Sequence, residues 1–142
     1  MEWPQALTDF RIHLKLERSL SDRTVEAYVH DLAKLRAFAE EHTPALKPVS
    51  IGLDDLQAFT THVAKQGLGA TSQARLLSAV RGFYKMLRIE KLITADPTEL
   101  LESPKTGRYL PVFLSIEEID AMVQAIDMSR PLAHRDRAMI ET

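Results

Sequence analysis

The chain has 142 residues, of which 45% are hydrophobic and 27% are charged, and its formal net charge at pH 7 is -2. This composition is typical of a globular chain that forms one domain, or one domain and the start of a second. The absence of cysteine excludes disulfides, thiolate metal sites and a cysteine nucleophile. Uncharged runs are too short to cross a bilayer, and the amino terminus does not resemble a secretion signal. We therefore expect a cytoplasmic protein with no membrane partner.

The charges are distributed unevenly along the chain. Residues 1–64 contain ten acids and seven bases, and residues 96–142 contain nine acids and five bases. Residues 65–91 between them contain six bases and a single acid. The net charge argues against non-specific attachment to nucleic acid, whereas the central block predicts one directed basic surface.

Apolar residues recur with helical spacing in almost every segment, so the sequence predicts an all-α fold. A first helix is expected from about Pro4, a residue favoured in the first helical turn, to Glu17. Ser21 is the expected N-cap of a second helix, which runs from Asp22 to His42.

A third helix is expected to begin at Leu53 and to end before Gly67, which suits the C′ position. The fourth helix is expected over residues 70–90, with one apolar side and one basic side. Gly82 lies inside this helix at a cost of about 1 kcal/mol relative to alanine, which suggests close packing or a close backbone approach. The apolar side comprises Leu76, Leu77, Val80, Phe83, Tyr84 and Leu87.

The character of the chain changes after the fourth helix. A helical turn is expected over residues 96–101, and the two prolines and one glycine of residues 102–114 predict a linker. Ser115 and Glu118 form the pattern of a capping box for another helix. The expected apolar face of that helix is Ile116, Ile119, Met122, Val123 and Ile126.

A last helix is expected from His134, and no stop signal precedes Thr142. We therefore expect the chain to end inside a second domain. The predicted division is a first domain over residues 1–101, a linker over 102–114 and the truncated start of a second domain over 115–142.

The residues needed for catalysis or metal binding do not form a recognisable pattern. The five histidines are scattered without ligand spacing, and glycine-rich phosphate loops are absent. Tyr28, Tyr84 and Tyr109 have no base or arginine cluster nearby in sequence. The sequence therefore predicts no catalytic residue, no metal, no cofactor and no small-molecule substrate.

The second and fourth helices each have a basic face that suits a DNA groove. Arginine and lysine neutralise phosphates, hydroxyl groups reach phosphates or base edges, and helix amino termini supply further donors. A basic face is more often merely solvated or paired with acids, and the acids at positions 40, 41, 54 and 55 are candidates for that pairing. The predicted DNA-binding residues are Arg23, Thr24, His30, Lys34, Thr71, Ser72, Arg75, Ser78, Arg81 and Lys85.

Several motifs, in the expected order, resemble the tyrosine site-specific recombinases, most closely the Xer group. Residues 19–21 (Ser-Leu-Ser), 24–28 (Thr-Val-Glu-Ala-Tyr) and 31–32 (Asp-Leu) resemble the start of the core-binding domain of that family. Residues 75–84 look like the last main helix of this domain, and residues 96–115 resemble the passage into the catalytic domain.

The resemblance implies a small SAM-like bundle of four to five helices, which forms half of a C-shaped clamp around duplex DNA. Two helices of the clamp would cross the major groove, and these are the same two helices whose basic faces are described above. The catalytic residues of the family would lie beyond the last helix, so neither Arg135 nor Arg137 is assigned a catalytic role. The chain is expected to bind an inverted-repeat recombination site without cleaving it.

The partners implied by the resemblance are double-stranded DNA and, in the full-length protein, other recombinase subunits. The parent protein would act in chromosome dimer resolution or in integration. The alternative is a helical protein-interaction module whose basic face docks an acidic partner.

Overall fold

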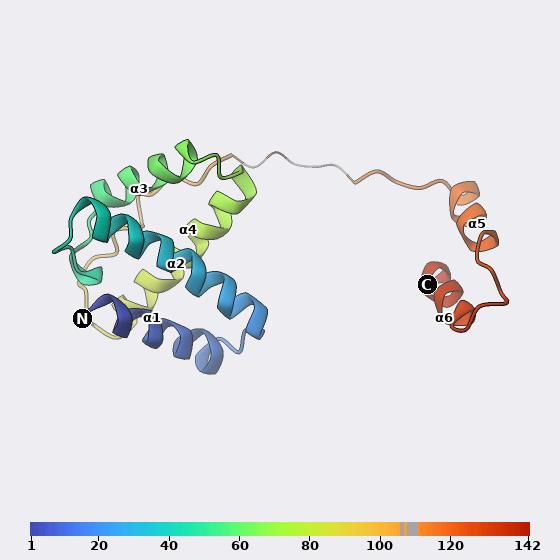
Figure 1. Ribbon diagram of the computed structural model, residues 1–142, viewed down its shortest axis with the longest axis horizontal. Coiled ribbons are helices and arrows are strands. Elements are labelled where there is room, and N and C mark those ends of the chain that lie inside the picture. Colours follow the sequence, from blue (N-terminus) through green and yellow to red (C-terminus); the bar gives the residue numbers. More distant parts are fainter. Residues whose placement is uncertain (106, 108–110) are drawn as a thin grey trace. The chain divides into compact units, whose positions relative to one another are not determined.

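The computed structural model describes residues 1–105, 107 and 111–142, and Tyr109 and Leu110 lie outside the described residues. In the described part every regular element is a helix, which confirms the all-α prediction. The chain divides into two compact units, Met1–Thr106 and Gly107–Thr142 (Figure 1). No helix within the described residues is both long and apolar enough to span a membrane.

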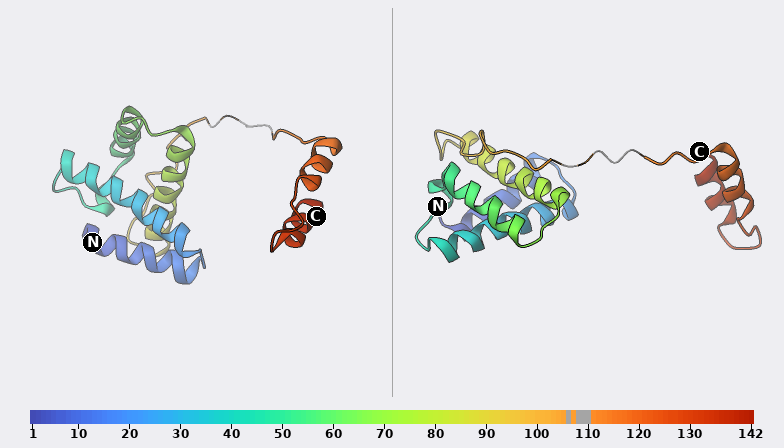
Figure 2. Two further views of the ribbon diagram at one scale, coloured as in Figure 1. Left: turned by 45° about the vertical axis from the view of Figure 1, so that its right-hand side comes forward. Right: turned by 90° about the horizontal axis from the view of Figure 1, so that it is seen from above.

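The first unit contains four α-helices: α1 (Trp3–Ile12), α2 (Asp22–His42), α3 (Leu53–Lys65) and α4 (Ala70–Ile89). A π-helical turn, His13–Glu17, continues α1, and a short 3-10 helix, Pro48–Ser50, precedes α3. Helix α2 packs against α1 and α4, and α4 also packs against α3 (Figures 1 and 2). Helix α4 is therefore covered on two sides by other helices.

The apolar side of α4 forms the centre of the core. All six residues predicted for that side are buried. Phe83 meets Phe10 of α1 edge to face, with ring centroids 5.5 Å apart, a favourable arrangement for aromatic pairs. Helix α2 contributes Val25, Leu32, Leu35, Phe38 and Ala39, which are all buried.

Local hydrogen bonds fix the ends of the helices where the sequence predicts them. Ser21 Oγ accepts a hydrogen bond from the backbone N–H of Thr24 at 3.3 Å, which caps α2. Gly67 has a φ of +81° after the end of α3. The N–H of Leu68 donates to the carbonyl of Val63, so α3 ends in a Schellman motif.

Gly82 packs less tightly than the sequence suggests. A Cβ added at this position would lie 3.7 Å from the ring of Phe10, an ordinary van der Waals distance. The backbone of α4 at Gly82 is helical, so it does not require glycine either. The expectation that close packing demands glycine here is therefore not confirmed.

The second unit contains α5 (Ile116–Gln124) and α6 (Ala133–Glu141), which pack against each other. The predicted capping box is confirmed, because the N–H of Ser115 donates to Glu118 Oε2 at 2.7 Å and the N–H of Glu118 donates to Ser115 Oγ at 3.2 Å. The predicted apolar face of α5 is not a buried face: Ile116 and Met122 are exposed. Helices α5 and α6 alone do not form a core that covers this apolar face.

Candidate nucleic-acid interface

Helices α2 and α4 are joined by a buried carboxylate. Asp31 of α2 has no exposed surface. It accepts hydrogen bonds from Arg75 of α4, with 2.8 Å between Nε and Oδ2 and 3.1 Å between Nη2 and Oδ1. Two parallel bonds of this kind fix the plane of a guanidinium as well as its position. The pairing therefore links the basic faces of the two helices.

Lys34 is the second cation of this cluster. Its Nζ lies 3.3 Å from Asp31 Oδ1, one turn along α2. The hydrogen bonds to Asp31, followed by the attraction of its charge, raise the pKa of the Arg75 guanidinium above its ordinary value. With one buried acid between two cations, the cluster carries a net positive charge at its surface.

Arg81 contacts the segment that follows the fourth helix. Its Nη1 donates to Ser103 Oγ at 2.7 Å, and its Nη2 donates to the carbonyl of Leu101. Arg88 forms a second contact of this type, with its Nη1 2.8 Å from Glu99 Oε1. Two basic residues of α4 therefore hold residues 99–103 against this helix.

Other predicted residues have side chains directed at solvent or at their own helix. Arg23, His30 and Lys85 are exposed, and within the described residues none of the three forms an ion pair. Ser78 Oγ donates to the carbonyl of Ala74 at 3.0 Å. Thr24 Oγ1 lies 2.9 Å from Ser21 Oγ at the start of α2. The bases of this set are free to meet a polyanion.

Thr71 and Ser72 lie in the first turn of α4. The N-cap residue is Gly69, which offers no side chain to accept hydrogen bonds from the N–H groups of that turn. Thr71 is exposed and Ser72 is half-buried. The helix start therefore combines free backbone donors with two hydroxyl groups.

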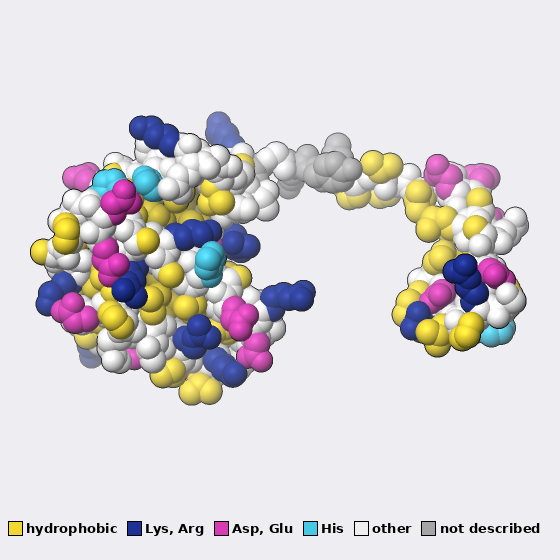
Figure 3. Space-filling model, in the orientation of Figure 1, with side chains coloured by type: hydrophobic (Ala, Val, Ile, Leu, Met, Phe, Trp, Pro, Cys, Tyr) yellow, Lys and Arg dark blue, Asp and Glu magenta, His cyan; other side chains and the backbone are white. Residues whose placement is uncertain are grey.

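The surface of the first unit reflects this arrangement. In Figure 3, Lys and Arg side chains and a histidine lie together over the part of the unit where α2 and α4 lie. We define the α2–α4 face as the ten predicted DNA-binding residues together with Asp31.

The acids proposed as pairing partners in the sequence are not the ones the structure uses. Glu40 binds Arg36 on its own helix, with 2.7 Å between Oε1 and Nε. Asp55 accepts a hydrogen bond from the N–H of Gly52 at 2.9 Å. In the described residues the acid that pairs with the α2–α4 face is Asp31, which sequence reasoning did not single out.

A signal for Asp31 was present in the sequence. Asp31 lies three residues after Tyr28 and four before Leu35, so it falls on the apolar stripe of α2. An acid in that position needs a cationic or hydrogen-bonding partner, because burying an unpaired charge is costly. Which basic residue reaches Asp31 depends on how α4 crosses α2, and that crossing is a property of the fold.

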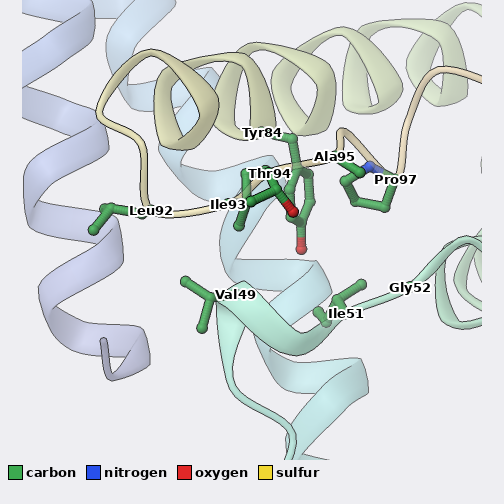
Figure 4. A pocket seen from close by; sticks show the side chains of 9 residues that line it. All are labelled: Val49, Ile51, Gly52, Tyr84, Leu92, Ile93, Thr94, Ala95 and Pro97. Carbon is green, nitrogen blue, oxygen red and sulfur yellow. The ribbon is translucent and has the colours of Figure 1, made fainter.

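An alternative site in the first unit is a pocket of about 460 Å³ beside Tyr84. Figure 4 shows Tyr84 pointing from α4 between residues 49–52 and residues 92–97. Its hydroxyl donates to the carbonyl of Pro48 at 3.0 Å, and burial raises the pKa of the phenol well above its usual range. A phenol held in this way is a poor nucleophile. The described residues also contain no cluster of three or more potential metal ligands.

Comparison with known proteins identifies the family. The family described as phage integrase, N-terminal SAM-like domain, matches residues 7–91, which contain both helices of the α2–α4 face. The chain belongs to the phage integrase family. Xer recombinases are among its relatives in that family, as the resemblance implied.

Tyrosine recombinase XerD of Chlorobaculum tepidum is 37% identical to the chain over 142 residues, covering 98% of this chain and 46% of the relative. Tyrosine recombinase XerC of Pelotomaculum thermopropionicum is 38% identical, covering 96% of this chain and 46% of the relative. Tyrosine recombinase XerD of Rhizobium meliloti is 42% identical over 110 residues, covering 78% and 35%. The chain thus spans about half the length, or less, of these curated relatives.

Proposed function

We propose that this chain is the DNA-binding part of a Xer-type tyrosine recombinase and that it binds duplex DNA through the α2–α4 face. The observation that carries the proposal is the family match over residues 7–91, which covers the two helices that Asp31 and Arg75 join. A site-specific recombinase must recognise duplex DNA before it can exchange strands. The basic faces of α2 and α4 are the surfaces of the first unit best suited to that task.

The residues of the face divide into two kinds of contact. Arg23 and Lys85 are exposed cations that suit phosphates, where they would release counterions. The uncapped start of α4, with Thr71 and Ser72, supplies donors for a phosphate oxygen. Arg75 is held more rigidly, by Asp31. Contacts to phosphates position a protein on DNA, whereas contacts to base edges give specificity.

The domain division proposed from the sequence accompanies this function. Residues 1–101 would be the clamp domain, residues 102–114 the linker and residues 115–142 the start of the catalytic domain. The division into units near residue 106 falls within the proposed linker. In this account the chain binds an inverted-repeat recombination site in the cytoplasm, and the other recombinase subunits join it in the full-length protein.

Fluorescence anisotropy tests the proposal directly. A labelled duplex carrying an inverted-repeat recombination site is titrated with the chain across a salt series, and a scrambled duplex of equal length serves as control. We expect tighter binding to the site and a linear fall of log affinity with log salt, because phosphate contacts release counterions. Absence of binding to either duplex at low salt would contradict the proposal and favour the acidic protein partner.

The competing function has one observation in its favour. Asp31 shows that Arg75 and Lys34 accommodate a carboxylate, the group that an acidic protein partner would present. That carboxylate belongs to the chain itself and is buried, so the two cations are already partly neutralised toward such a partner. We therefore place DNA first.

A further inference from the structure

The contact between Asp31 and Arg75 uses one particular edge of the guanidinium. Its donors to Asp31 are Nε and Nη2, which form the side edge of the group. A guanidinium has five N–H donors, and its end edge is formed by Nη1 and the second N–H of Nη2. The described residues place no acceptor at Nη1 of Arg75. A complete two-donor fork therefore remains for a ligand.

This fork is held in place before any ligand arrives. Asp31 is fully buried and belongs to α2, whereas the Arg75 side chain belongs to α4 and is 49% exposed. Free arginine side chains lose considerable rotamer freedom when they bind. A guanidinium already fixed by two hydrogen bonds loses less, so its binding is stronger and its direction is defined.

The charge of Asp31 also influences which acceptor suits the fork. A fully charged phosphate is attracted by Arg75 but repelled by the carboxylate next to it, which weakens the net attraction. A guanine base edge carries no net charge and offers O6 and N7, the acceptor pair that an arginine fork matches in the major groove. The geometry thus favours a base edge over a phosphate at Arg75.

Lys34 keeps the cluster attractive to DNA as a whole. Its ammonium shares Oδ1 of Asp31 with Arg75, and its side chain is 34% exposed. Two cations around one acid leave one net positive charge. The cluster as a whole is therefore attracted to DNA, while the free Nη1–Nη2 edge of Arg75 is directed away from the Asp31 carboxylate.

We propose that Asp31 is a positioning residue that holds Arg75 so that its free Nη1–Nη2 edge reads a guanine in the major groove. This inference rests on the proposed DNA-binding function and assigns the specificity at one base pair to the pair Asp31–Arg75. The remaining cations of the α2–α4 face would supply affinity without sequence preference.

A selection from randomised DNA tests the inference whatever the target site is. A pool of duplexes of random sequence is bound to the wild-type chain, and the bound fraction is sequenced to obtain the base preference at each position. The Asp31→Asn variant is treated in the same way. Its side-chain NH₂ opposes an arginine donor, so the double contact is broken with little change of shape.

We expect Asp31→Asn to reduce the guanine preference at one position about tenfold, the discrimination that one bidentate contact provides. Binding to the unselected pool should stay equal or become tighter, because one negative charge is removed from the face. A purely structural role of Asp31 would weaken binding to all sequences alike. That result, or an unchanged preference profile, would overturn the inference.

Two further variants keep the test decisive. Glu40→Gln removes one negative charge from the same helix outside the cluster, where Glu40 pairs with Arg36, and should leave every base preference unchanged. Arg75→Gln replaces the two-donor fork by one donor and one acceptor, a pair that matches adenine, so it should lose the same guanine preference. If circular dichroism shows that Asp31→Asn does not fold, Arg75→Gln decides: a retained guanine preference overturns the inference.

The outcomes for the wild-type chain separate the two proposals. A chain that binds the pool without any guanine preference keeps the proposed function and overturns the reading role of Arg75. A chain that binds no duplex at low salt overturns the proposed function itself. A double variant that combines Asp31→Asn with the substitution of Arg75 should lose no more guanine preference than either single variant, because both changes act on one contact.

Discussion

At the residue scale, the α2–α4 face combines cations that differ in what they do for the fold. Arg75 satisfies a buried carboxylate, Arg81 satisfies a backbone carbonyl, and Lys85 does neither in the described part of the chain. Removing a cation from this face therefore has a different structural cost at each position. Measurements of DNA affinity on such variants require a stability measurement beside them.

Arg75→Ala should lower the free energy of unfolding by about 1–3 kcal/mol, because it leaves the buried Asp31 carboxylate with Lys34 as its remaining partner. Lys85→Ala should change it by less than about 0.5 kcal/mol, as is usual for an exposed side chain. Urea unfolding followed by circular dichroism measures both. Equal stability of the two variants would show that Asp31 gains little from Arg75.

Gly82→Ala should raise the free energy of unfolding by about 0.5–1 kcal/mol. Alanine is the better helix former, and its Cβ would meet the Phe10 ring at 3.7 Å, where no neighbour has to move. Thermal melting detects the change as a higher midpoint. A lower midpoint would mean that Phe10 cannot accept the added methyl group.

At the element scale, α4 is the central helix of the first unit. It packs against both α2 and α3, and its residues Phe83 and Tyr84 are buried in the core. Phe83→Ala should lower the free energy of unfolding by about 3–5 kcal/mol, since the ring is fully buried. Ile89→Ala near the end of the same helix is the matched control, because Ile89 is 61% exposed. Similar losses in urea unfolding for both variants would refute this orientation of α4.

Tyr84 links the stability of α4 to alkaline pH. Burial, followed by the charges of Asp55 and Asp96, raises the pKa of its phenol well above the usual range. The folded chain therefore keeps the proton that the unfolded chain loses at about pH 10. The resulting stability is present below that pH and is lost as the pH rises above it.

We expect the free energy of unfolding of the wild-type chain to fall more steeply above about pH 10 than that of Tyr84→Phe. Tyr84→Phe should also be less stable at neutral pH by about 1–3 kcal/mol, because the Pro48 carbonyl loses its donor. Urea unfolding at a series of pH values measures both effects. Parallel pH profiles would contradict the role assigned to the phenol.

The helices and their ends could be predicted from the sequence because local chemistry determines them. Ser21, Gly67 and the Ser115–Glu118 pair cap or end helices through contacts within a few residues of chain. The contact between Asp31 and Arg75 spans 44 positions, and no local pattern reveals it. The exposed face of α5 shows the converse: an apolar pattern predicts a buried surface but not the element that covers it.

At the scale of the whole molecule, the proposed function needs only the first unit. The family match lies within it, and so do all ten predicted DNA-binding residues. Those residues were chosen for charge and position on their helices, and the structure brings Lys34 and Arg75 together while Arg81 contacts residues 101 and 103. Spacing along a helix predicted the faces, whereas their partners depend on packing between elements.

The most direct test of the central claim compares two double variants of equal charge. Arg23→Ala with Lys85→Ala removes two cations from the α2–α4 face, and Arg11→Ala with Lys47→Ala removes two exposed cations elsewhere on the same unit. The salt dependence of affinity for a labelled duplex is measured for both by anisotropy. We predict that the first variant binds more weakly and that the magnitude of its log–log salt slope falls by about two, which corresponds to the loss of two phosphate contacts. The second variant should retain the wild-type slope. Equal slopes for the two variants, or a loss confined to the second, would contradict DNA binding through the α2–α4 face.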